Sequence, residues 1–171
     1  MTPEGTTQED STPEAQALLA SLDAQRNHVL GILEGLSEED LRRPVLPSGW
    51  TSLGLVRHLA LDVERFWFRA VVAGERVDLE TGDAGWQVPP GMSAEAVFDL
   101  YRAEARLADA VIAGTALDAL PAWWPDFFGD WPPRELRKTV LHVVTETACH
   151  AGHLDAVREL IDGRTWLVLT E

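Results

Sequence analysis

Residues 134–163 read RELRKTVLHVVTETACHAGHLDAVRELIDG and predict one long helix that ends at Gly163. A glycine favours such an end because it readily takes the left-handed conformation of a helix C-cap. Four side chains with metal-binding groups share one narrow stripe of this helix: His142, Glu146, His150 and His153. A bundle helix normally presents leucine along such a stripe, so these polar side chains indicate a functional site.

The composition indicates one globular domain. The 171 residues suffice for a full hydrophobic core, and 46% apolar with 25% charged residues is ordinary for a globular protein. The net charge of −14 disfavours nucleic acid and anionic membranes as partners, because both need basic protein surface. No apolar run approaches the roughly 20 residues of a membrane span, so we expect no membrane partner.

The N-terminus and the single cysteine favour a cytoplasmic location. Residues 1–12 lack the basic start and apolar core of a signal peptide. We predict a flexible acidic tail there, followed by a single domain over residues 13–171. Cys149 is the only cysteine, which excludes an internal disulfide and suits a reducing compartment.

The spacing of apolar residues predicts an all-α fold, a four-helix bundle with long connections. The first helix covers residues 13–36. The second opens at Thr51, a good N-cap, and ends before Gly74, and the third opens at Ser93. Residues 75–92 are rich in glycine and proline and predict a loop.

The connector over residues 114–133 contains five aromatic residues: Trp123, Trp124, Phe127, Phe128 and Trp131. Leaving these rings in water is unfavourable, so we expect the connector to fold over the end or the wall of the bundle. The rings fit either an interface or a substrate pocket, and the sequence leaves both open. Residues 166–169 are expected to dock as an extended segment.

A candidate metal site follows from His58, which lies on the core-facing stripe of the second helix. With Glu146 and His150 it would supply two imidazoles and one carboxylate, leaving a position open for water or substrate. Zinc is the metal we expect, although nickel, iron, manganese or cobalt also suits such a set. The alternative is that each histidine is a half-buried imidazole hydrogen-bonded to backbone.

The chain resembles the DinB-like superfamily in six short motifs: WT at 50–51, GLVRHL at 54–59, VERFWF at 63–68, YRAE at 101–104, ETACHAGHLD at 146–155 and RELIDG at 158–163. More narrowly, it is similar to a branch near mycothiol-dependent maleylpyruvate isomerase. The resemblance covers nearly the whole chain after the acidic tail, and the motif at 146–155 is the most specific.

The resemblance implies an up-down-down-up bundle with one divalent metal near its middle. Carried over by motif, the ligands are His58, Glu146 and His150. Glu146 departs from the three-histidine version of the family and matches the isomerase-like members. His153 stands where many members have glutamine and is either an additional ligand or a residue that supports the ligands.

The neighbours of these residues have open roles. Asp62 lies one turn after His58 and either accepts its second ring N–H or pairs with Arg65 or Arg69. Glu104 interrupts the apolar stripe of the third helix, and we favour a pairing with an arginine such as Arg57 over a hydrogen bond to a metal ligand.

Three further side chains are weaker candidates. Cys149 is a possible soft ligand, but a small packing residue is the preferred interpretation. His142 lines the pocket or acts as a base. His28 lies off the main stripe of the first helix and is expected on the surface.

Three functions remain open at this stage. The first is a metal-dependent thiol transferase or isomerase that uses mycothiol or a similar low-molecular-weight thiol with a small-molecule substrate. The second is metal-assisted hydrolysis with His153 or His142 as the base. The third is a metal-binding, stress-related bundle without turnover. A homodimer is expected for the third of these, and the sequence alone does not determine the oligomeric state.

Overall fold

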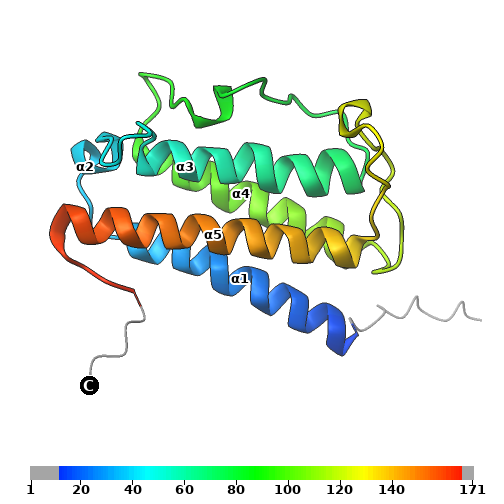
Figure 1. Ribbon diagram of the computed structural model, residues 1–171. Coiled ribbons are helices and arrows are strands. Elements are labelled where there is room, and N and C mark those ends of the chain that lie inside the picture. The colour runs from blue at the N-terminus through cyan, green and yellow to red at the C-terminus, as the bar shows by residue number, and fades with distance from the viewer. Residues whose placement is uncertain (1–11, 167–171) are drawn as a thin grey trace, which may run out of the picture.

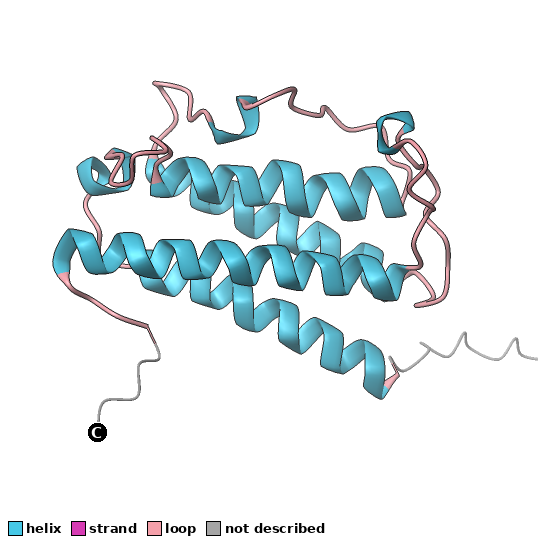
Figure 2. Ribbon diagram, viewed as in Figure 1, coloured by secondary structure: helices cyan, strands magenta, loops and turns pink. Residues whose placement is uncertain are grey.

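The computed structural model describes residues 12–166, which form an all-α bundle (Figures 1 and 2). Its helices are α1 Pro13–Leu33, α2 Glu38–Arg42, α3 Ser52–His58, η1 Leu59–Val72, η2 Ala84–Trp86, α4 Ala94–Ala113, η3 Asp126–Phe128 and α5 Leu136–Asp162. The expected all-α fold is confirmed. The predictions for residues 1–11 and 167–169 lie outside the described residues.

The four long helices lie side by side, α3 continuing into η1 as one of them. Helix α1 packs against α5, and η1 packs against α4 and α5. In Figure 1, α3–η1 and α4 run in one direction, whereas α1 and α5 run in the other. Two parallel neighbours need a long crossover, and residues 73–93 provide it by returning along the outside of the bundle. This is the expected up-down-down-up order.

The helix ends at Thr51, Ser93 and Gly163 carry the local signals that the sequence indicated, and Thr12 adds a cap that was not predicted. Hydroxyl oxygens of three cap residues accept backbone N–H groups: Thr12 from Ala15, Thr51 from Gly54 and Ser93 from Ala96. Gly163 closes α5 in the left-handed conformation, with φ of 78°. No described helix is long and apolar enough to cross a membrane.

Helix η1 differs from a regular α-helix because its backbone is wound more widely, as a π-helix. At its end the Ala73 N–H donates to the carbonyl of Phe68, five residues back. π-helical turns are uncommon and recur at functional sites. Here the change begins directly after His58, and nothing in the residue pattern predicted it.

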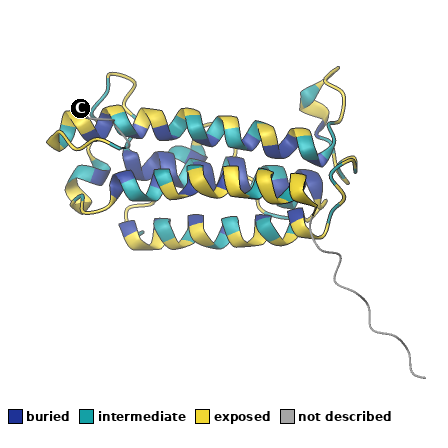
Figure 3. Ribbon diagram, turned by 90° about the horizontal axis from the view of Figure 1, so that it is seen from below, coloured by how far each residue is buried: buried dark blue, intermediate teal, exposed yellow. Residues whose placement is uncertain are grey.

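The buried residues of the helices face one another, as Figure 3 shows, and most of them are apolar. The core includes Leu22, Val29, Leu59, Phe68, Tyr101, Ile112, Val140 and Leu154. A fully buried ion pair crosses this core. Arg26 Nε and Nη2 donate to the two carboxylate oxygens of Glu64 at 2.7 and 2.8 Å, and Arg26 Nη1 reaches Asp109 at 2.7 Å. Arg26 thereby ties α1 to η1 and α4.

Two expectations about polar residues are corrected. Glu104 does pair with arginine, but its partners are Arg65 and Arg69 at 2.7 and 3.1 Å, not Arg57. Both partners lie on η1, which packs directly on α4. His28 is not a free surface residue, because its Nε2 lies 2.7 Å from Asp155 Oδ1 and its ring stacks on Trp166 at 5.0 Å.

The aromatic connector folds over one end of the bundle, as expected. The backbone N–H groups of Ala122 and Trp123 donate to the carbonyls of Val72 and Val71 at the end of η1. Rings of the connector then pack on Phe66 and Trp67 of η1, with Trp67 stacked on Phe128 at 5.5 Å between centroids.

Candidate metal centre

Three candidate ligand atoms converge between the end of α3, which carries His58, and α5, which carries Glu146 and His150. His58, Glu146 and His150 each offer one nitrogen or oxygen, and these atoms all lie within 4.8 Å of one another. His150 Nε2 is 3.3 Å from Glu146 Oε1. Ligands at zinc distances of about 2.0–2.1 Å in a tetrahedron lie about 3.3 Å apart. The separation of Glu146 and His150 matches this value, and the set offers the nitrogen and oxygen donors that a divalent ion binds.

A second residue fixes the orientation of His58. Its Nδ1 lies 2.8 Å from Asp62 Oδ2, one helical turn further along. With the proton held on Nδ1 by the carboxylate, Nε2 is left with its lone pair for a metal. The alternative pairing of Asp62 with Arg65 or Arg69 is wrong, because both arginines bind Glu104.

The surroundings of His150 lower its pKa and so favour its neutral form. Burial lowers its pKa, and the nearby His58 lowers it further, while Glu146 opposes both effects. A neutral imidazole is the form that binds metal. Its Nδ1 is buried and has no hydrogen-bond partner within the described residues. Buried polar atoms are rarely left alone in proteins, so this nitrogen also indicates a site that takes a ligand.

Trp86 covers the centre from the crossover loop, a role that the sequence pattern did not reveal. Its indole stacks on the His58 ring at 4.1 Å and 15°, and lies edge-on to His150 at 5.6 Å. The indole of Trp86 therefore excludes water from one face of the His58 imidazole.

Two glycines allow the loop to approach so closely. A Cβ on Gly85 would collide with the Asp62 carboxylate, and a Cβ on Gly54 would collide with the Trp86 carbonyl oxygen. Arg57 then fastens the loop by donating to the carbonyls of Ala84 and Gly85. In the sequence, Gly85 directly before Trp86 within a predicted loop is the feature that could have indicated this contact.

The remaining candidates lie around the three ligands. His153 is exposed, with its ring 5.6 Å from His150 and 6.2 Å from Trp50. His142 lies one turn before Glu146 with its ring edge-on to Trp67 at 4.8 Å, and burial lowers its pKa. Cys149 is exposed, so its interpretation as a packing residue is wrong, and it is outside the group of converging ligands.

The fold and the centre together define a class: helical bundles whose middle carries a histidine and carboxylate donor set. Within that class the chain belongs to the Mycothiol-S-transferase family, whose model matches residues 17–163. This family lies in the DinB-like superfamily, which confirms the resemblance seen in the motifs. A search of curated proteins gave no match.

Proposed function

We propose that the protein is a divalent-metal-dependent S-transferase that joins mycothiol, or a similar low-molecular-weight thiol, to a small electrophile. His58, Glu146 and His150 would hold the metal, with zinc as the preferred ion and nickel, iron or manganese as alternatives. The observation that carries the proposal is the convergence of these donors within 4.8 Å in a chain of the Mycothiol-S-transferase family. The family description favours transfer over isomerisation.

A divalent ion at this position would lower the pKa of a bound thiol, so that sulfur reacts as the thiolate. The protein's own residues prepare for this in three ways. Asp62 orients His58 through the 2.8 Å contact to Nδ1. Burial lowers the pKa of His150, which favours the neutral imidazole. Trp86 shields the His58 ring from water at 4.1 Å.

The transfer conserves electrons and needs no redox partner. A sulfur lone pair forms the new S–C bond, the electrophile's C–X bond breaks, and X departs with the bonding pair. The thiol proton passes to X or to solvent, which gives a thioether and HX. His153 is the candidate proton acceptor, because it is exposed and its ring lies 5.6 Å from His150. His142 is the alternative, because burial lowers its pKa and so favours the neutral imidazole.

The test is thioether formation from mycothiol and chlorodinitrobenzene by chelator-treated protein, with and without added zinc. The proposal expects product only in the reconstituted sample, and expects His58→Ala to remain inactive in both. Equal rates with and without metal would contradict it. Hydrolysis of ester or amide substrates in the absence of thiol would favour the metal-dependent hydrolase instead, and tight metal binding without either reaction would favour a binding protein.

Two further properties remain predictions. A homodimer is expected, which sedimentation of the purified protein would test. A cytoplasmic location is expected from the mycothiol-related family and the sequence, and fractionation of cells would test it.

A further inference from the structure

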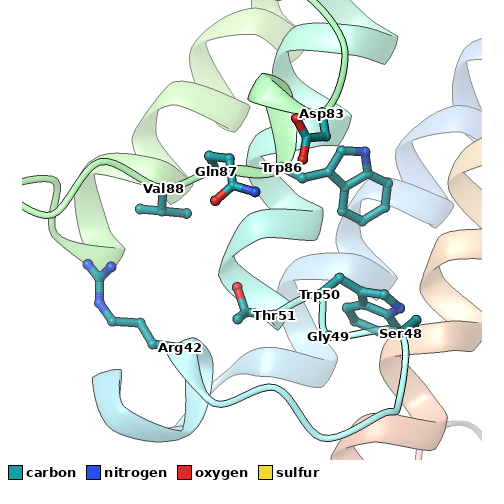
Figure 4. Close-up of a pocket in the computed structure, with 9 residues that line it drawn as sticks. All are labelled: Arg42, Ser48, Gly49, Trp50, Thr51, Asp83, Trp86, Gln87 and Val88. Carbon is teal, nitrogen blue, oxygen red and sulfur yellow. The ribbon is translucent and has the colours of Figure 1, made fainter.

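A pocket of about 460 Å³ opens beside the candidate metal centre, between the 48–51 connector and the 83–88 turn (Figure 4). Its volume is within the range of small-molecule sites. Figure 4 shows the indoles of Trp50 and Trp86 on one side of the opening and Arg42 on the other. The candidate metal ligands do not line this pocket, and the packing of the helices does not require it.

The two indoles connect the pocket to the centre. Trp86 stacks on His58 at 4.1 Å, and Trp50 lies 6.2 Å from the ring of His153. The walls at this end of the pocket are therefore also the walls of the metal site. A ligand with sulfur at the metal would have its remaining atoms pass along these rings into the pocket.

The pocket lining is more polar than that of a usual small-molecule site, in which apolar side chains predominate. Its polar side chains are Arg42, Ser48, Thr51, Asp83 and Gln87, and Val88 is the one aliphatic residue in the lining. Within residues 12–166, the side chains of Ser48, Asp83 and Gln87 form no hydrogen bond or ion pair. Their hydroxyl, carboxylate and amide groups are free to bind a ligand.

This combination fits a ligand rich in hydroxyl groups. A carboxylate accepts hydroxyl protons, an amide both donates and accepts, and a guanidinium donates to hydroxyl oxygens. Indole faces offer flat apolar surface for the C–H faces of a saturated ring. An apolar electrophile would leave these polar groups without partners, which is unfavourable.

We propose that the pocket binds the sugar portion of the thiol, and that Asp83 and Gln87 select mycothiol over simple thiols. This inference rests on the proposed function, because it takes the thiol's sulfur to lie at the metal. Mycothiol joins its cysteine to a glucosamine–inositol pair, which supplies hydroxyl groups for the polar end and ring faces for Trp50 and Trp86.

The experiment measures binding of three probes to the zinc-loaded full chain by calorimetry: mycothiol, N-acetylcysteine and the glucosamine–inositol fragment without cysteine. Asp83→Ala and Gln87→Ala should each raise the Kd for mycothiol about three- to tenfold, the range of a lost hydrogen bond. The Kd for N-acetylcysteine should change less than twofold. Asp118→Ala, the same change on another exposed loop residue, should leave all three values unaltered.

The outcomes separate this inference from the function on which it rests. Fragment binding that is weakened by both pocket variants supports the inference, even if no thioether forms with any electrophile. Unchanged mycothiol affinity in both variants overturns it, as does an equal loss for mycothiol and N-acetylcysteine. Unaltered melting temperatures and circular dichroism of the variants exclude misfolding, since both side chains are exposed.

Discussion

The two ends of the polar stripe on α5, which runs from His142 to His153, meet aromatic residues that are arranged in opposite ways. At the His153 end, Trp50 and Trp86 line an open polar pocket. At the His142 end, Trp67 packs against Phe128 at 5.5 Å and is part of a ring cluster that closes the bundle. Aromatic residues thus line a pocket at one end and form an apolar cover at the other, and their neighbours set this difference.

The source of the difference is local. At the pocket end, glycines at 54 and 85 let a loop lie close to α3 and η1, and the loop brings polar side chains with it. At the cluster end, the connector supplies rings that pack on one another, with Trp124 and Phe128 only 4.7 Å apart. The first arrangement leaves room for a ligand, and the second fills its space with side chains.

Removing one ring at each end gives the largest contrast. Trp67→Ala should lower the free energy of unfolding by about 2–3 kcal/mol, because a large, half-buried ring leaves a cavity. Its effect on mycothiol affinity should stay within twofold. Trp50→Ala should show the reverse order, with a small loss of stability and a larger loss of mycothiol affinity. Urea unfolding measures the stability of each variant, and calorimetry measures its mycothiol affinity. Similar changes in the two variants would contradict the difference between the two ends.

Asp62 offers a test on the pocket side alone, since it contacts both His58 and the turn at Gly85. Asp62→Asn should weaken metal affinity about 10- to 100-fold, the range for residues that orient a ligand histidine. A competition titration with a chromophoric chelator measures this. Asp118→Asn is the matched control, and wild-type affinity in Asp62→Asn would show that the 2.8 Å contact does not orient His58.

Acid should destabilise the metal-free protein through histidines at the stripe. Burial lowers the folded-state pKa of His142 and His150 below the unfolded value of about 6.5. The unfolded chain therefore binds more protons in this range, so stability falls as pH falls from about 6.5 toward the folded values. His142→Gln should flatten this dependence in chelator-treated protein. If the variant unfolds with the same pH dependence as wild type, groups other than His142 cause the loss of stability in acid.

The smallest effect is expected at the outer edge of the cluster. Phe127 is 74% exposed although its ring contacts Phe128. Phe127→Ala should change the free energy of unfolding by less than about 0.5 kcal/mol. A loss as large as that of Trp67→Ala would mean that the cluster is stabilised at its exposed rim.

The sequence predicted what depends on local chemistry. Thr51 and Ser93 mark helix starts because their hydroxyls satisfy free N–H groups, and Gly163 marks the end of α5. Offsets of four residues brought Glu146 and His150 together on one helix face, and a core-facing position brought His58 to them. These inferences need only helix geometry.

Contacts between distant segments were not predictable in the same way. The buried pair of Arg26 and Glu64 joins residues 38 positions apart, and no periodicity links them. The sequence predicts only that Trp86 lies in a loop. Its stacking on His58 was not predictable, because it depends on how the crossover returns along the bundle. The π-helical winding that follows His58 was likewise not predictable from the residue pattern.

The most direct test of the metal centre is elemental analysis of wild type, His58→Ala and His150→Ala, all purified without a histidine tag. We predict about one divalent ion per chain in wild type and none in either variant, with helical circular dichroism retained in all three. Stoichiometric metal in both variants would contradict the assignment of the ligands. Wild-type protein that contains no metal and resists reconstitution would contradict the metal centre itself.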